Sequence, residues 1–291
     1  MIDIRLPGLA TLSLFAALFA SAGAKAAGTP APLRDIHYGP GAEQTLDVYR
    51  PAAAHDAPII LMVHGGGWRL GDKAMARMVD SKVQRWVPRG FVFVSIDYGL
   101  LPRTTVARQA DDVAHAIAFV QQHANDWGGD GDKLLLMGHS AGAHLVALLD
   151  AAPQRARAAG ARQWLGTIAL DSAAYDIPAI MQRRHLPLYD AAFGTDPAQW
   201  TALSPLAQLD GAGPPLLAVC SSVRPDDPCA DARRFAARAV AFERRVEVLP
   251  QALSHAQINA TLGAPGAYTD AVEAFMKSLD PALRRQLEAT P

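Results

Sequence analysis

The stretch KLLLMGHSAGAHLVALL, residues 133–149, decides the fold of this chain. It opens with a run of apolar residues typical of a buried β-strand, continues with the motif GHSAG at 138–142, and then runs on without proline or glycine in a pattern typical of a helix. The sequence therefore predicts a sharp strand-to-helix turn with Ser140 at its tip.

The residues around Ser140 suit a catalytic nucleophile. In a G-x-S-x-G turn the serine backbone is strained, and small neighbours let the turn close and lift the hydroxyl above the sheet. The N–H of Ala141 would then lie at a helix N-terminus, where negative charge is stabilised. Five residues can also form a tight turn around an inert serine, but the preceding strand and the following helix favour a nucleophile.

A second glycine motif, HGGGW at 64–68, directly follows the apolar run at 58–63. Acyl transfer develops a negative oxygen, and backbone N–H groups must converge on it. Glycines allow such a close backbone approach, so we expect the N–H groups of Gly66, Gly67 and Ala141 to form the oxyanion hole. The alternative is an ordinary connector, for which three successive glycines carry a large entropic cost. His64 is expected to bond the loop backbone.

Apolar runs and helical patterns alternate along the rest of the chain. Strands are expected at 45–50, 58–63, 91–96, 133–137, 165–170, 215–220 and 245–249, with helical patterns between most of them. This order predicts an α/β fold, with a mostly parallel central sheet and helices on both faces. The segment at about 172–209 breaks the alternation and is expected to form a short insertion over the active site. Its many charges favour a small soluble substrate over a lipid.

The two glycine motifs together resemble the α/β-hydrolase superfamily, and most closely its hormone-sensitive-lipase-like bacterial carboxylesterases and the related arylformamidases. The segments DYGLLP at 97–102 and SPL at 204–206 resemble further parts of those enzymes. The resemblance, over about residues 33–280, implies the α/β-hydrolase fold and a serine hydrolase that cleaves an ester through an acyl-enzyme on Ser140. An arylformamidase or other amidase is the alternative, and a catalytically inactive hydrolase fold that only binds is a remote one.

Among the nine histidines, His255 is expected to be the catalytic base. In this fold the chain order is nucleophile, acid, histidine. His255 follows the late strand at 245–249, and the loop QALSHAQ around it should let the ring reach Ser140. His185 belongs to the insertion and precedes the penultimate strand, which is the wrong place.

The acid is expected after the strand at 215–220, where the chain reads CSSVRPDDPC. This departs from the family pattern, in which a glycine and then an aspartate follow closely. Asp231 belongs to the following helix, which leaves Asp227 as the favoured acid and Asp226 as the alternative. A disulfide between Cys220 and Cys229 would bracket them. Two free thiols are the other interpretation.

The length and composition complete the prediction. The chain has 291 residues, half of them hydrophobic, and a formal net charge of -1, which suits a single domain and gives no indication of nucleic-acid binding. Residues 1–26 are predicted to be a signal peptide, because small residues with Ala-x-Ala cleavage sites follow the apolar run at 9–22. An uncleaved membrane anchor is the alternative, but the run is short for a spanning helix. Residues 27–291 would then form an exported hydrolase domain, periplasmic or secreted, without stable membrane insertion. No metal or cofactor motif is found, so none is predicted.

Overall fold

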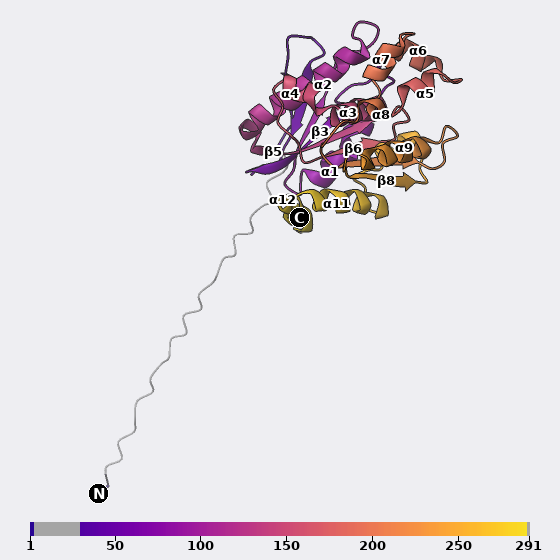
Figure 1. Ribbon diagram of the computed structural model, residues 1–291. Helices are drawn as coiled ribbons and strands as arrows, with labels where there is room; N and C mark the ends of the chain where they lie inside the picture. Colours follow the sequence, from indigo (N-terminus) through magenta and orange to yellow (C-terminus); the bar gives the residue numbers. More distant parts are fainter. Residues whose placement is uncertain (3–29, 290–291) are drawn as a thin grey trace.

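A computed structural model describes residues 1–2 and 30–289 of the chain (Figure 1). The predicted signal peptide falls on residues that lie almost entirely outside the described part. Among the helices of the described part, none combines the length and the apolar character that a membrane crossing requires.

The centre of the fold is an eight-stranded sheet in the order β1-β2-β4-β3-β5-β6-β7-β8. The strands β1 and β2 join it in antiparallel pairing, and all later pairs are parallel. The mostly parallel sheet predicted from the sequence is therefore confirmed. The bounds of the strands are β1 Leu33–His37, β2 Thr45–Tyr49, β3 Ala57–Val63, β4 Val92–Ile96, β5 Gly129–His139, β6 Gly166–Leu170, β7 Leu216–Ser221 and β8 Val246–Gln251.

Helices cover both faces of this sheet, and this explains why the central strands are apolar throughout. Every residue of β3 is buried. Because successive side chains of a strand point to opposite faces, Ile59 and Leu61 pack on one side while Ile60 and Met62 pack on the other.

The helices α2, α3 and α9 pack on one face, and α1, α11 and α12 pack on the other (Figure 1). Their bounds, with those of the 3₁₀ helix η1 and the remaining helices, are α1 Ala76–Trp86, α2 Val106–His123, η1 Ala124–Trp127, α3 Ala141–Ala151, α4 Pro153–Ala158, α5 Ile177–Met181, α6 Pro187–Phe193, α7 Pro197–Ala202, α8 Pro205–Gln208, α9 Pro228–Val240, α10 His255–Ala260, α11 Ala267–Leu279 and α12 Pro281–Glu288.

The segment between β6 and β7 folds as four short helices, α5 to α8, grouped beyond one end of α3 (Figure 1). Each has a proline in its first turn, which suits a position where the backbone N–H needs no partner within the helix. Asp176, Asp196 and Ser204 cap three of them with side-chain oxygens. Local capping thus defines this segment where no regular apolar period does.

Candidate active site

Ser140 lies between the end of β5 and the start of α3, on the sharp turn that its motif predicts. Its φ of 56° and ψ of -117° put a residue with a side chain in a strained backbone region. The Ser140 N–H donates to the carbonyl of Leu170 at 2.9 Å, and its own carbonyl accepts from the His144 N–H at 3.0 Å. Contacts on both sides thus hold the turn in its strained form.

The two glycines of the turn are required by close backbone packing. A Cβ at Gly138 would lie 2.4 Å from the Gly142 carbonyl oxygen, and one at Gly142 would lie 2.3 Å from the Val63 carbonyl oxygen. Both distances are far below van der Waals contact. The motif therefore follows from how tightly α3 packs over the ends of β5 and β3.

His255 meets the serine hydroxyl. Its Nε2 lies 2.9 Å from Ser140 Oγ. The sequence had indicated a loop here, but His255 is the first residue of α10, because Ser254 and Gln257 form a reciprocal capping box that starts the helix. The ring is therefore presented from a helix N-terminus, and a loop does not have to close over the serine.

Neighbours on either side fix the position of α10. The His139 Nε2–H donates to the His255 carbonyl at 3.0 Å, and burial lowers the pKa of His139 to about 3, so this ring is neutral. The Nζ of Lys82, a buried residue of α1, donates to the carbonyl and side-chain oxygens of Asn259 at 2.7 and 2.9 Å. Both ends of the short helix are thus anchored to the body of the domain.

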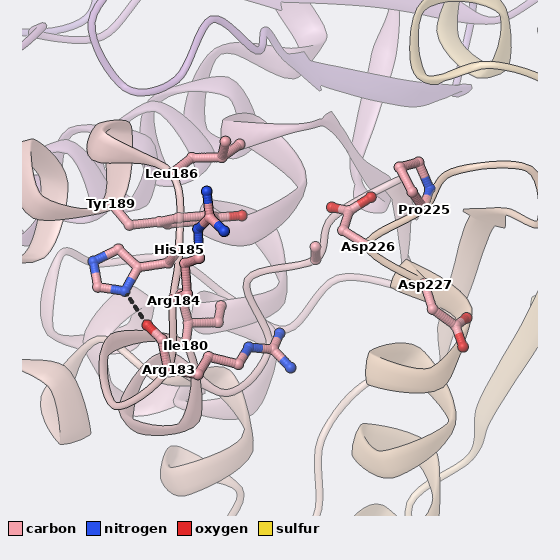
Figure 2. A pocket seen from close by; sticks show the side chains of 10 residues that line it. Ile180, Arg183, Arg184, His185, Leu186, Tyr189, Pro225, Asp226 and Asp227 are labelled. Carbon is pink, nitrogen blue, oxygen red and sulfur yellow. Dashed lines mark hydrogen bonds between the residues drawn. The ribbon is translucent and has the colours of Figure 1, made fainter.

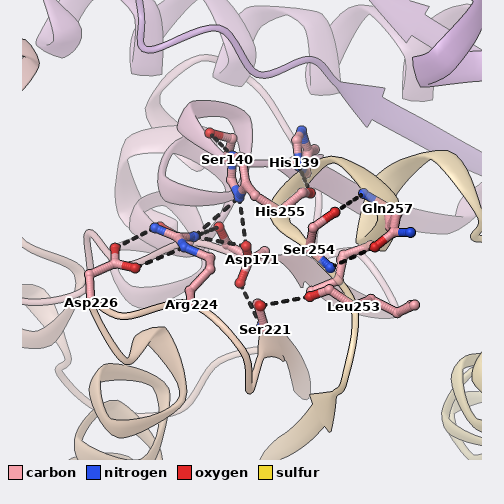
Figure 3. Close-up of polar contacts among 12 residues, drawn as sticks. His139, Ser140, Asp171, Ser221, Arg224, Asp226, Leu253, Ser254, His255 and Gln257 are labelled. Carbon is pink, nitrogen blue, oxygen red and sulfur yellow. Dashed lines mark hydrogen bonds and ion pairs between the residues drawn. The ribbon is translucent and has the colours of Figure 1, made fainter.

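The carboxylate that contacts His255 is Asp171, which the sequence interpretation did not consider. Its Oδ2 lies 2.6 Å from His255 Nδ1, and its side chain is fully buried (Figure 3). Asp171 directly follows β6, one strand earlier than expected. β6 pairs with β5 on one side and β7 on the other, so the ends of all three strands lie close to the serine turn.

Hydrogen bonds keep Asp171 ionised despite its burial. Burial by itself raises the pKa of a carboxyl, but the contacts from His255, from the Ser221 N–H at 2.7 Å and from Arg224 at 2.8 Å lower it, and the net pKa lies below its ordinary value. A charged acceptor therefore faces His255 Nδ1.

The structure corrects the predicted acids. The favoured acid, Asp227, is the N-cap of α9, where its side chain accepts from the Ala230 N–H at 3.0 Å and is largely exposed. Asp226 pairs with Arg224 through both of its oxygens. Neither aspartate reaches His255, because the turn before α9 uses one as a cap and the other as the partner of an arginine. An aspartate at the end of the buried run GTIAL, next to the serine strand, was the available signal for Asp171.

The loop 64–68 is held close to Ser140 by a set of buried contacts. His64 is fully buried, its Nδ1 donates to the Gly65 carbonyl at 2.8 Å, and its ring stacks on Tyr98. Gly66 has a φ of 128°, and a Cβ there would lie 1.9 Å from the Leu70 carbonyl oxygen. His64 thus bonds the loop backbone, as expected, and Gly66 cannot be replaced without moving the loop.

Trp68 joins this loop to the insertion. Its indole Nε1–H donates to His144 Nδ1 at 3.2 Å, and His144 Nε2–H donates to the Leu203 carbonyl at 2.8 Å. Burial lowers the pKa of His144 to about 4, so the ring is neutral and can accept at one nitrogen while it donates at the other. This chain of bonds ties the glycine loop, α3 and the segment before α8 into one unit.

Two hollows open beside the serine, and Gly67, Ser140 and His255 line both. One, of about 240 Å³, is also lined by Trp68, Leu188 and Tyr189, and the other, of about 440 Å³, by Met75 and Met78. A larger hollow of about 960 Å³, which neither Ser140 nor His255 lines, lies between the α5–α6 segment and the loop after β7 (Figure 2). It shares Ala173, Leu186 and Tyr189 with the first, so the two adjoin.

Cys220 and Cys229 form a disulfide with a Cα separation of 5.2 Å. The bond connects the end of β7 to the first turn of α9, and so closes the loop that carries Arg224 and Asp226. The bracket predicted from the sequence is present, but it encloses Ser221 and Arg224, two partners of Asp171, and not Asp171. Within residues 30–289, no group of three or more His, Cys, Asp or Glu side chains is arranged to hold a metal ion.

Known proteins are similar to this chain both in sequence and in architecture. A protein-family model described as BD-FAE matches residues 46–163. Esterase LipQ of Mycobacterium tuberculosis is 31% identical over 220 residues, which cover 70% of this chain and 51% of LipQ. The chain thus spans about half the length of that relative.

Solved structures match over most of the fold. Esterase 2 of Thermogutta terrifontis superposes with a TM-score of 0.66 at 25% identity, covering 84% of this chain and 90% of that one. Esterase B of Lactobacillus rhamnosis superposes with a TM-score of 0.70 at 18% identity, covering 88% and 87%. Because these structures superpose over most of the chain, the architecture is that of the α/β-hydrolase fold.

Proposed function

We propose that this protein is a serine carboxylesterase in which Ser140, His255 and Asp171 form the catalytic triad. The observation that carries the proposal is one continuous chain of contacts: Ser140 Oγ lies 2.9 Å from His255 Nε2, and His255 Nδ1 lies 2.6 Å from Asp171 Oδ2. Hydroxyl, imidazole and buried carboxylate in this order are the arrangement that activates a serine for attack on a carbonyl.

Acylation starts when His255 Nε2 takes the proton of Ser140 and Oγ attacks the ester carbonyl carbon. Asp171 accepts the Nδ1–H bond, which leaves Nε2 free as the base and stabilises the imidazolium that forms. The C–O bond to the alcohol then breaks, and the alcohol oxygen takes the proton from Nε2. In deacylation His255 Nε2 takes a proton from water, and the water oxygen attacks the acyl carbon. The bond from that carbon to Oγ then breaks, Oγ takes the proton back from Nε2, and the carboxylic acid is released.

The negative oxygen of each tetrahedral intermediate requires fixed donors. We assign this role to the backbone N–H groups of Gly66, Gly67 and Ala141. Gly67 and Ala141 line the same hollow as Ser140, and the buried contacts of His64 and Trp68 hold the loop before the substrate arrives. Donors that need no rearrangement stabilise the charge at the least cost.

The proposed substrate is a small-molecule ester whose acyl group and alcohol group each occupy a separate hollow. The two hollows of about 240 and 440 Å³ that Ser140 lines support this, since one can receive the acyl group and the other the alcohol. The names of LipQ and of the esterases with solved structures support the same bond type.

The experiment compares the wild type with Ser140→Ala on nitrophenyl esters of graded acyl length and on formyl-anilides. We expect ester turnover, labelling of Ser140 by a fluorophosphonate, and a loss on the order of 10⁴- to 10⁶-fold in kcat in the variant. Ser278→Ala, on α11, is the matched control and should keep full activity. Retention of a tenth of the activity in Ser140→Ala would exclude this nucleophile, and faster turnover of the anilides would make the enzyme an amidase.

We also propose that the protein is exported. The apolar run at 9–22 followed by small residues supports a cleaved signal, and the Cys220–Cys229 disulfide is stable in an oxidising compartment. Fractionation of cells expressing the full chain, with the intact mass of the product, tests this. A product that keeps residues 1–26 in the cytoplasm would contradict export.

A further inference from the structure

Arg224 occupies the position after β7 where the sequence had suggested an acid. Its Nη1 lies 2.8 Å from Asp171 Oδ2 and 3.1 Å from His255 Nδ1 (Figure 3). Its Nε and Nη2 both donate to the carboxylate of Asp226. The guanidinium therefore connects Asp226 to the buried Asp171 and to the partly exposed His255.

Two donors share a single oxygen in this arrangement. Asp171 Oδ2 accepts from His255 Nδ1–H and from Arg224 Nη1–H, while Oδ1 accepts from the Ser221 N–H. With its proton on Nδ1, His255 has no lone pair for Arg224, so the 3.1 Å approach brings two donors together. The arginine fixes the carboxylate, and it also places a permanent positive charge beside the imidazole.

We propose that Arg224 is a positioning residue whose bond to Asp171 Oδ2 holds that carboxylate against His255, and that Asp226 balances the positive charge of Arg224. The inference rests on the proposed esterase function and adds a second ion pair to its triad. Asp226 accepts two parallel hydrogen bonds from Arg224, in the bidentate geometry that is common between arginine and a carboxylate. The remaining nitrogen, Nη1, is then directed at Asp171. The Cys220–Cys229 disulfide closes the loop that carries both residues.

The charges around His255 give the two residues opposite effects. The groups that face its ring are Asp171 from the end of β6, Arg224 from the loop after β7 and His139 from the end of β5. His139 is neutral because burial lowers its pKa to about 3. Arg224 therefore opposes formation of the imidazolium, and Asp226, which lies beyond it, reduces that opposition.

The test is the pH dependence of kcat/KM for a nitrophenyl ester with wild type, Arg224→Gln and Asp226→Asn. Loss of the positive charge lets His255 take a proton more readily, so Arg224→Gln should move the acid limb about one pH unit upward. Loss of the balancing charge should move it downward by about half a unit in Asp226→Asn. A role limited to folding gives no displacement of opposite sign.

Turnover gives the second readout. Arg224→Gln should lower kcat about 10- to 100-fold with little change in KM, because the acid loses one of its three donors. Arg224→Lys should keep the acid limb near its wild-type position and recover part of kcat. Arg233→Gln, on α9 and away from His255, is the matched control. Thermal melting identifies any variant that fails to fold, and the pH profile is then read on Asp226→Asn and Arg224→Lys.

The possible results are distinguishable. If the acid limb of kcat/KM moves in the same direction in Arg224→Gln and Asp226→Asn, or does not move, the proposed role of Arg224 is overturned and the proposed esterase function is unaffected. A wild type without ester turnover or fluorophosphonate labelling overturns the proposed function itself.

Discussion

His255 Nδ1 lies 2.6 Å from Asp171 Oδ2, although 84 residues separate the two in the chain. The contact exists because β6 and β8 run parallel, with β7 between them, so that their carboxyl ends lie at the same edge of the sheet. Asp171 cannot turn away, because its N–H bonds to the Val219 carbonyl and its Oδ1 to the Ser221 N–H.

Replacing Asp171 with Asn should lower kcat about 10⁴-fold, because the amide favours the tautomer whose Nε2 carries the proton. Asp227→Asn is the control: it keeps a capping side chain on α9 and should leave kcat within twofold. Ester hydrolysis at pH 8 for both variants decides between the acids. A large loss in Asp227→Asn with an active Asp171→Asn would return the acid to the loop after β7.

The glycine loop offers a pair of variants that differ in one contact. A Cβ at Gly66 would meet the Leu70 carbonyl oxygen at 1.9 Å, so Gly66→Ala should displace the loop and cost about 10²- to 10³-fold in kcat. At Gly67 a Cβ meets nothing within 4 Å, and the φ of 60° costs Ala about 1 kcal/mol, so Gly67→Ala should lose less activity. Equal losses would show that backbone freedom matters more than the position of the Gly66 N–H.

Removal of the disulfide should destabilise the fold and slow turnover together. For so short a loop the chain-entropy model gives about 2–3 kcal/mol. The double variant Cys220→Ser, Cys229→Ser should therefore melt several degrees lower and lose kcat more than KM, since Arg224 and Asp226 lie within the loop. Wild type treated with a reductant should behave in the same way. Unchanged kcat in the double variant would show that the loop keeps its form without the bond.

The burial of Lys82 predicts that the free energy of unfolding rises with pH. Burial lowers its pKa to about 7 in the folded chain from 10.5, so between these values the unfolded chain binds more protons than the folded one. Stability then increases with pH across this window, by about 2 kcal/mol from pH 7 to 9. Urea unfolding of Lys82→Met should lack this increase, while Lys277→Met, on α11, should keep it. An identical slope in all three proteins would show that Lys82 is solvated.

The sequence was sufficient for those features in which the backbone demands particular residue types. Gly138 and Gly142 are needed by a turn that a Cβ would break, and the apolar run 58–63 is needed by a strand covered on both faces. Ser140 could be predicted as the nucleophile because it follows such a strand directly, and His255 as the base because it comes shortly after the last strand. These are constraints within a few residues, which a single sequence carries.

The acid could not be placed in the same way, because its identity depends on which strands are neighbours. Asp171, Asp226 and Asp227 all follow apolar strands in the order nucleophile, acid, histidine. Only the structure shows that Asp227 begins a helix and that Arg224 takes the remaining space beside His255. Competition between side chains for one position is a property of packing.

The ends of β6 and β7 both reach the same nitrogen of the same ring. Asp171 comes from one and Arg224 from the other, and each lies within about 3 Å of His255 Nδ1. A carboxylate on either loop would therefore be within reach of the imidazole, and the fold offers two alternative positions for the acid. Both positions lie between the serine and the histidine in the chain, so the order of the three residues alone cannot tell them apart.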